Sequence, residues 1–438
     1  MNSHPPRQNG GAGSDRARGW AVVSWGAYLA CSWTWCIGMF LPILLVRDYG
    51  PWAFVVFAAP NVVGAAAMGW VLRPGAAEEI LERHRHACRL FSAVTIAFQL
   101  CFLNFVGLRL FPLPWGVLGA DLVLLGACFA GRRWAPLVWA ASLGLLVALG
   151  WGARAGAGSG FTGFWAFGAG DGAPAQRSLA GLALLAPVCV FGFALCPYLD
   201  LTFLRARREL ARRPARRAFT LGFGVLFLAM IIGTLVYAPT LVHLLDNAAP
   251  AGLAGAMAIP AWAVYVLVAH LFLQLVYTIG VHAREYARSC PSAGSRVVPF
   301  LLGSIAFVAS VVLLHDQNRP GAIGDPEAVY RSFMAFYGLV FPAYVWICMI
   351  PSRDRHGAAH SGIDGPLGRR KLAVFAVCVL AAMPMYWLGF IDRDERWLAP
   401  GLALVLIARL AATRPRARGH TARPQAGAPP TDPARRVT

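Results

Sequence analysis

The chain has 438 residues and a formal net charge of +19, and 58% of its residues are hydrophobic while only 13% are charged. A soluble globular protein carries roughly 25% charged residues, so this composition excludes a soluble or disordered chain and indicates a polytopic membrane protein. The ten cysteines form no CxxC pair and fall mostly in apolar runs, which argues against a disulfide framework or a metal site. We therefore expect neither a metal nor a cofactor.

Apolar runs recur along the whole chain. A membrane span needs about 20 mostly apolar residues, and such runs predict an all-α protein with about twelve transmembrane helices. Their approximate bounds are 20–46, 52–72, 88–110, 114–130, 133–151, 179–203, 217–245, 258–282, 296–315, 328–350, 370–390 and 396–412. Seven tryptophans lie near the run ends, as in interfacial aromatic belts: Trp20, Trp52, Trp70, Trp115, Trp134, Trp151 and Trp397.

The basic residues predict the orientation of these spans. With both termini in the cytoplasm, 31 of the 39 lysines and arginines fall in cytoplasmic segments and 8 in the opposite ones. Such an excess is typical of the cytoplasmic side, so the net charge reflects topology rather than nucleic-acid binding. The cluster from Arg205 to Arg217 is suited to anionic lipid. Lys371 is the only lysine, which favours a GC-rich bacterial genome and a bacterial inner membrane.

Three segments lie outside the predicted spans. Residues 1–19 and 414–438 are rich in Gly, Pro, Ala and Arg, cannot bury a core, and are predicted to be disordered cytoplasmic tails. The longest external loop is 152–178, which carries aromatic residues among glycines. No soluble domain fits anywhere in the chain.

The first and sixth runs share an interruption. The first contains Gly38 and Pro42 after Cys36, and the sixth contains Gly192 followed by Cys196-Pro197. Glycine and proline at mid-depth break helices, and freed backbone groups are tolerated in a membrane only where they face protein or a wet cavity. The alternative is that these residues merely kink packed spans.

The third and eighth runs each carry a polar stripe. The first stripe is Ser92, Thr95 and Gln99, and the second is His270, Gln274, Tyr277 and Thr278. Their spacings place each set on one helix face. Runs 1–5 and 6–10 therefore match feature by feature, and because five is odd the second set is inverted relative to the first.

This pattern resembles the five-plus-five inverted-repeat fold of the amino acid–polyamine–cation transporter superfamily, which includes the bacterial leucine transporter and the sodium:solute symporters. The stretch from Phe57 to Trp70 reads like a second helix of such permeases. The resemblance implies repeats over 20–151 and 179–350, and two appended helices over 351–413. It departs from the sodium-dependent pattern because the eighth run offers Thr278 without a paired Ser or Thr.

The interruptions and the stripes supply the candidate site. The predicted solute-binding residues are Ser32, Trp33, Thr34, Cys36, Gly38, Gln99, Gly192, Cys196, Pro197, His270 and Gln274. The predicted ion-coupling residues are Asp200, His270 and Thr278. Trp35 would add a pocket wall. Each polar candidate has a structural alternative: Asp200 is also placed to cap a half-helix or to pair with an arginine, and His270 to be a hydrogen-bonded packing residue.

The resemblance implies a secondary transporter in which spans 1, 2, 6 and 7 rock against spans 3, 4, 8 and 9. Sparse intramembrane charge favours a small zwitterionic or neutral solute, coupled to protons or sodium. Asp121, in the fourth run, is expected to be neutral or paired. The chain carries no nucleotide-binding fingerprint, and we expect no enzymatic activity.

Two other classes stay open. A membrane-embedded transferase for lipid-linked sugars or acyl chains would need a polar cluster at one membrane face. The external candidates for such a cluster are His315, Asp316, Arg319, Asp325 and Glu327. The second class is a membrane sensor without flux. The oligomeric state does not follow from the sequence.

Overall fold

The computed structural model describes residues 11–110, 126–156, 178–246, 261–290, 326–350 and 366–413, together with residues 292, 301, 305 and 308. Within these residues the chain is all-helical and contains no strand. Nine of the described helices are long and apolar enough to cross a membrane, and a bent pair of shorter helices makes a tenth candidate. The protein is therefore a multi-pass membrane protein by the length and composition of its helices.

The first half of the chain supplies four of these candidates. Its helices are α1 (Gly11–Trp33), α2 (Cys36–Tyr49), α3 (Trp52–Val71), α4 (Ala76–Leu110), the short 3₁₀ turn η1 (Arg132–Trp134) and α6 (Ala135–Gly156). The helices α1 and α2 form the bent pair, with an angle of 57° between them. The predicted fourth span, 114–130, falls largely outside the described residues, as does Asp121.

The second half begins with a candidate span, Leu179–Leu199, that is followed by a short helix. Its elements up to residue 289 are α8 (Leu179–Leu195), the 3₁₀ turn η2 (Cys196–Leu199), α9 (Leu201–Glu209), α10 (Arg212–Leu221), the π-helical η3 (Gly222–Phe227), α11 (Leu228–Asp246) and α12 (Ala261–Ser289). The predicted ninth span, 296–315, lies outside the described residues apart from three single positions.

The remaining elements form the last three candidate spans. They are α14 (Pro326–Ala335), the π-helical η5 (Phe336–Val340), α15 (Phe341–Tyr344), the π-helical η6 (Val345–Met349), α16 (Pro366–Phe390), the 3₁₀ turn η7 (Glu395–Trp397) and α17 (Leu398–Thr413). Segments α14 to η6 together make one span that contains two wide π-helical turns.

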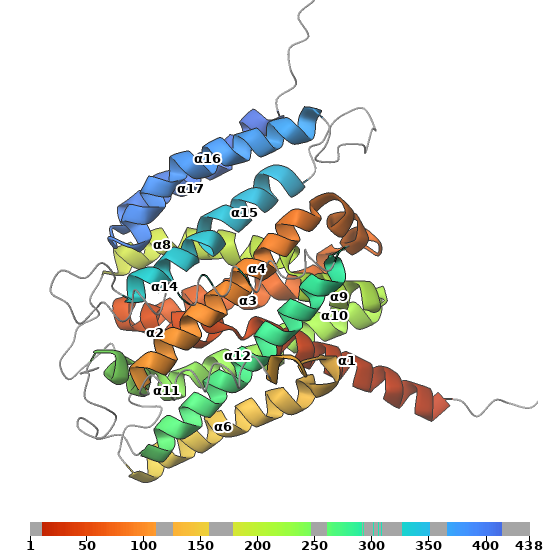
Figure 1. Cartoon of the computed structure of the whole chain (residues 1–438), viewed down its shortest axis with the longest axis vertical. Helices are drawn as coiled ribbons and strands as arrows, with labels where there is room; N and C mark the ends of the chain where they lie inside the picture. The colour runs from red at the N-terminus through yellow and green to blue at the C-terminus, as the bar shows by residue number, and fades with distance from the viewer. Residues whose placement is uncertain are drawn as a thin grey trace, which may run out of the picture.

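The long helices lie side by side in one bundle (Figure 1). At one edge α16 packs against α17, and at the other α12 packs against α6. Between these edges α3 packs against α8, and α12 also packs against α4. Helices α9 and α10 lie at one end of the bundle, which we call the arginine-rich end because it carries Arg205, Arg208, Arg212, Arg213, Arg216 and Arg217.

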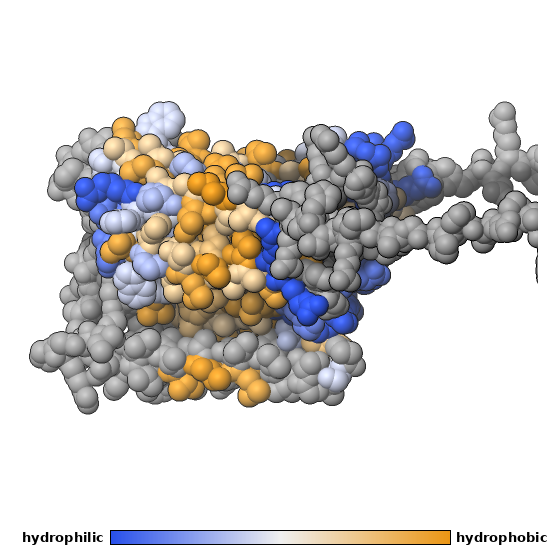
Figure 2. Space-filling model, turned by 90° about the horizontal axis from the view of Figure 1, so that it is seen from above, coloured by the Kyte–Doolittle hydropathy of each residue, from blue (hydrophilic) through white to orange (hydrophobic). Residues whose placement is uncertain are grey.

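The surface supports a membrane-embedded orientation of this bundle. In Figure 2 an apolar band crosses the visible face and hydrophilic residues gather at both of its ends. Helices α16 and α17 expose large apolar side chains such as Leu380 and Ile407. Six of the seven tryptophans expected at the interface are exposed, with relative accessibilities from 42% to 75%: Trp20, Trp52, Trp70, Trp134, Trp151 and Trp397. A hydrophobic girdle with aromatic residues at helix ends is what a bilayer requires.

Glycines allow the backbones of the central helices to touch. A Cβ atom on Gly64 of α3 would lie 2.4 Å from the carbonyl oxygen of Phe193 in α8. A Cβ atom on Gly280 of α12 would lie 2.2 Å from the carbonyl oxygen of Ala127. Helix association in a membrane depends on such close packing, because lipid provides no hydrophobic force between helices. These two contacts fix α3 on α8 and α12 on the segment before α6.

The structure corrects the position of the first helix interruption. The predicted segment from Cys36 to Pro42 is helical in α2, and Pro42 lies inside that helix. The interruption instead falls at Thr34 and Trp35, where Trp35 is extended with φ −100° and ψ −172°. Pro42 removes only one helical hydrogen bond, whereas an extended Trp35 lets the indoles of Trp33 and Trp35 pack against different helices.

The second interruption overlaps only the end of the predicted segment, at Cys196 and Pro197. Gly192 to Leu195 still belong to α8, and the helix gives way to the 3₁₀ turn that begins at Cys196-Pro197. Asp200 is extended and caps the next helix, α9, by accepting a hydrogen bond from the Thr202 backbone N–H at 2.7 Å. Proline starts the turn and an aspartate caps the new helix, so this segment ends one helix and begins another.

Candidate functional site

The end of α1 meets the start of α9 in the interior of the bundle. The Thr202 hydroxyl, in the first turn of α9, lies 3.1 Å from the Ser32 hydroxyl in the last turn of α1. The rings of Trp33 and Phe203 pack with centroids 4.9 Å apart. All four of these side chains are buried. Two helix breaks separated by about 160 residues in the chain therefore form a single internal site.

Backbone groups freed by the first interruption are bound by side chains from three other spans. The Thr278 hydroxyl of α12 donates to the Cys31 carbonyl at 3.2 Å. The Cys36 N–H donates to Gln99 Oε1 of α4 at 3.4 Å, and the Tyr330 hydroxyl of α14 donates to the Cys36 carbonyl at 3.1 Å. These partners satisfy groups that would be costly to leave unpaired in a membrane interior.

One polar side chain on this wall is only half satisfied. Gln99 is fully buried, and its amide nitrogen Nε2 has no hydrogen-bond partner among the described residues. Because its Oε1 binds the first N–H of α2, the amide group lies beside the N-terminus of that helix. The Gln99 amide and the first turn of α2 thus provide several hydrogen-bond donors in one place, and this arrangement suits an anionic group.

Aromatic rings close the site on its other sides. Trp35, in the interruption itself, packs edge-on against Tyr337 of η5 with centroids 4.7 Å apart. Phe91 of α4 contacts the Trp33, Trp35 and Tyr337 rings. The Tyr337 hydroxyl lies 3.1 Å from Thr95 Oγ1, and the Cys196 thiol donates to the Tyr337 carbonyl. Trp35, predicted as a pocket wall, therefore belongs to an aromatic cluster that fills the centre.

Asp200 lies next to a histidine. Its Oδ1 accepts hydrogen bonds from the backbone and the hydroxyl of Thr202, both at 2.7 Å. Its Oδ2 lies 3.9 Å from Nε2 of His282 in α12. The His282 ring continues to Ser92 of α4, whose hydroxyl is 3.3 Å from Nδ1. All four residues are buried, and the capping role considered for Asp200 is confirmed for its Oδ1.

Four of the predicted solute-binding residues make their contacts within their own helix or with other helices, away from the backbone groups freed between α1 and α2. Thr34 hydrogen-bonds back to the Ala30 carbonyl in its own helix, and Gly192 packs against the Tyr337 carbonyl. His270 faces Tyr237 of α11, with ring centroids 5.8 Å apart, and Gln274 donates to Ser142 of α6 at 2.5 Å.

Most of the other predicted residues lie around the two interruptions. Ser32, Trp33, Cys36, Gln99, Cys196, Asp200 and Thr278 lie at the meeting of the interruptions, Pro197 begins the turn η2, and Gly38 lies beside Phe227. His270 and Gln274 lie toward the opposite end of α12 from the Asp200 contact, and they bind neighbouring helices instead of the interruptions.

Sequence reasoning missed His282 and the tyrosines. His282 follows Thr278 by four residues and so continues the polar stripe of α12, a signal that was present in the spacing. Tyr330 and Tyr337 are seven residues apart on one span, but tyrosines are common in spans and nothing in the sequence links them to Cys36 or Thr95.

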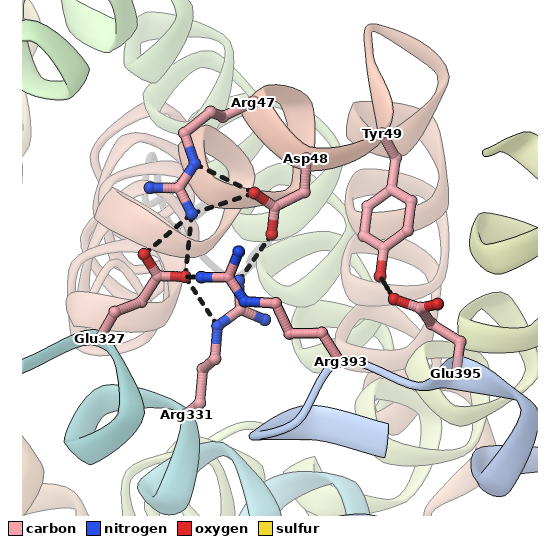
Figure 3. A network of polar contacts seen from close by, with 7 residues as sticks. All are labelled: Arg47, Asp48, Tyr49, Glu327, Arg331, Arg393 and Glu395. Carbon is pink, nitrogen blue, oxygen red and sulfur yellow. Dashed lines mark hydrogen bonds and ion pairs between the residues drawn. The ribbon is translucent and has the colours of Figure 1, made fainter. Parts of the chain in front are cut away.

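A charged cluster lies at the end of the bundle opposite the arginine-rich end. We call it the ion network; it comprises Arg47, Asp48, Glu327, Arg331 and Arg393 (Figure 3). Arg47 of α2 binds Glu327 of α14 through two contacts at 2.8 and 2.9 Å, and Arg331 binds Asp48 at 2.6 Å. Beside it, the Tyr49 hydroxyl donates to Glu395 at 2.6 Å.

The ion network bears on the transferase hypothesis. Glu327, one of the candidate catalytic residues for that activity, binds Arg47, Arg331 and Arg393 simultaneously. A carboxylate shared by three guanidinium groups is a poor base, because each cation stabilises its ionised form. The other four candidates, His315, Asp316, Arg319 and Asp325, lie outside the described residues.

No group of three or more His, Cys, Asp or Glu side chains in the described part of the chain is placed to hold a metal ion. Comparisons with protein-family models, with curated proteins and with solved structures found no match to this chain.

Proposed function

We propose that the protein is a secondary active transporter that moves a small zwitterionic or neutral solute across the bacterial inner membrane. The observation that carries the proposal is the meeting of the two interrupted helices, shown by the contact of Ser32 with Thr202 at 3.1 Å. Interrupted helices that meet inside a helical membrane bundle provide backbone groups for binding a solute at mid-depth. A bundle that served only to anchor the chain would have no need of them.

The chemistry of the centre supports a zwitterion. The Gln99 amide and the first turn of α2 offer donors to a carboxylate. The rings of Trp33, Trp35 and Tyr337 offer apolar and cation-binding surface to the rest of the molecule. A polyanion would find no buried arginine or lysine among the side chains that line this centre.

The ion network supports alternating access. It joins the end of α2 to α14 and to Arg393 after α16, so it closes the bundle at the end opposite the arginine-rich end. By the distribution of basic residues that end is external. In the transport cycle we propose, the structure corresponds to a state closed toward the outside, and opening requires these ion pairs to separate.

Counterflow in proteoliposomes tests the proposal. The purified full chain is reconstituted and assayed with radiolabelled glycine, leucine, proline, betaine and a neutral sugar, with succinate as a dianionic comparison. At least one zwitterion or neutral solute is expected to exchange faster than in protein-free liposomes.

Two matched glutamine variants locate the site. Gln99→Leu should slow exchange by about 10–100-fold, because one or two hydrogen bonds to the solute are lost. Gln274→Leu, the same change on a glutamine bound to Ser142 of α6, should leave exchange near the wild-type rate. Equal rates in the two variants would contradict the proposed site, and exchange of no solute in the panel would contradict the function.

A further inference from the structure

Two buried polar atoms face each other without a hydrogen bond. Asp200 Oδ2 and His282 Nε2 are 3.9 Å apart, and neither has a hydrogen-bond partner among the described residues. Both side chains are essentially inaccessible to solvent, at 0% and 1%. Buried polar atoms are nearly always satisfied, so a pair of orphaned atoms directed at one another points to a group that binds between them.

The contact with Ser92 allows a tautomer of His282 in which that group is a proton. The Ser92 hydroxyl lies 3.3 Å from His282 Nδ1. When this hydroxyl accepts the Nδ1 proton, Nε2 carries a lone pair toward the carboxylate oxygen of Asp200. Two acceptors then face each other, and a single added proton on the Asp200 carboxyl group converts this unfavourable contact into an O–H···N hydrogen bond to Nε2. A hard alkali cation would prefer a shell of oxygen ligands to an imidazole nitrogen.

The position of the pair links it to motion of the helices. Asp200 caps α9, the short helix that follows the sixth span, and His282 and Ser92 belong to α12 and α4. In the proposed cycle the sixth span moves relative to the third and eighth. The contact therefore crosses the interface along which the two parts of the protein would separate.

The pair also lies near the arginine-rich end. Arg205 follows Asp200 by little more than one helical turn on α9, and Glu285 is one turn beyond His282 on α12. Glu285 is paired with Arg288. The titratable groups that interact with Asp200 are Tyr28 from α1, Cys88 from α4 and Tyr337 from η5. Arg205 from α9 and Glu285 and Arg288 from α12 interact with Tyr28 in turn.

We propose that Asp200 and His282 together bind the proton whose movement drives transport, an inference that rests on the proposed function. With the proton bound, the pair is joined across the interface and carries no net charge. When the proton leaves toward the arginine-rich end, a buried carboxylate faces a neutral imidazole lone pair. That arrangement is costly without water, so it favours separation of α9 from α12. No other atom is transferred.

Infrared titration of the full chain in lipid nanodiscs tests the proton site without any solute. The signal is the carbonyl stretch of a protonated carboxyl group, followed as pH is varied. We expect this band in the wild type and its loss in Asp200→Asn, a change that keeps the Oδ1 cap of α9 and therefore the fold.

Two further variants make the assignment specific. His282→Gln should shift the midpoint of the band by roughly one to three pH units, since the imidazole that accepts the carboxyl proton is removed. Asp394→Asn, the same change as Asp200→Asn on a carboxyl outside the membrane, should leave the band as it is. An unchanged band in Asp200→Asn, or an unchanged midpoint in His282→Gln, would overturn the proton site.

Transport assays then separate coupling from flux. In Asp200→Asn, accumulation driven by a pH gradient should fall by about tenfold or more, and this loss should exceed any loss of counterflow, which needs no gradient. Accumulation that still follows the pH gradient in this variant, or that follows a sodium gradient in the wild type, would refute the coupling role. Failure of counterflow in the wild type would instead refute the transporter itself.

Discussion

The ion network and the Asp200–His282 pair are both built from charged side chains that join distant helices, yet they differ in how their charges are matched. In the ion network every carboxylate binds at least two guanidinium groups, at the partly accessible end of the bundle. In the pair, two completely buried atoms face each other without a bond. Matched charges stabilise one arrangement, whereas an incomplete contact is ready to gain or lose a proton.

The largest effect should come from removing a carboxylate of the ion network. Asp48 is 1% accessible and lies between Arg47 and Arg331. Asp48→Ala would leave both guanidinium groups less well paired, and we expect a loss of about 2–4 kcal/mol of stability. The midpoint of thermal unfolding in detergent measures this. Asp394→Ala, which removes the partner of the exposed Arg396 side chain, is the control and should lower the midpoint much less.

A smaller effect is expected beside the ion network. Tyr49→Phe removes the hydroxyl that donates to Glu395 at 2.6 Å and retains the ring. Because the acceptor is charged and buried, the loss should be about 1–2 kcal/mol in the same unfolding assay. Phe390→Leu, which alters packing against Tyr386 near the same end, tests whether ring packing alone accounts for the change. A variant as stable as the wild type would show that Glu395 is satisfied without Tyr49.

Substitution in the Asp200–His282 pair should change stability much less than substitution in the ion network. Asp200→Asn keeps the cap on α9 and exchanges a buried carboxyl group for a neutral amide, so stability should change by less than about 1 kcal/mol. This result, set against the large loss in Asp48→Ala, would establish that the two sites differ in kind. Equal destabilisation by both substitutions would remove the distinction.

The smallest expected effect is on how stability changes at acidic pH. The Arg396 guanidinium, hydrogen-bonded to Asp394 in the turn before α17, holds the pKa of that carboxyl below its usual range. Its contribution to stability is therefore present above the unfolded value of about 3.9 and is lost as pH falls through the folded value. Unfolding midpoints of the wild type and Asp394→Asn should converge below about pH 4. A difference that is constant with pH would contradict this assignment.

Periodicity and composition were sufficient to predict the helical membrane bundle and the existence of two interruptions. They did not locate the first interruption, because a proline at position 42 fits within a helix when its neighbours supply the packing, and the extended conformation of Trp35 depends on Tyr337 and other distant rings. The stripe on α12 illustrates the same limit. Gln274 and Thr278 lie on one face in sequence terms, yet the first binds α6 and the second binds the end of α1.

The absence of a side chain at Gly64 has a consequence for how the protein is made. The backbone of Phe193, more than 120 residues further along the chain, packs directly against this glycine. During synthesis the second span must therefore wait in the membrane, with its packing face toward lipid or an insertion factor, until the sixth span has entered. A chain that stopped at residue 156 would lack the contacts that Gly64, Ser32 and Trp33 make with Phe193, Thr202 and Phe203.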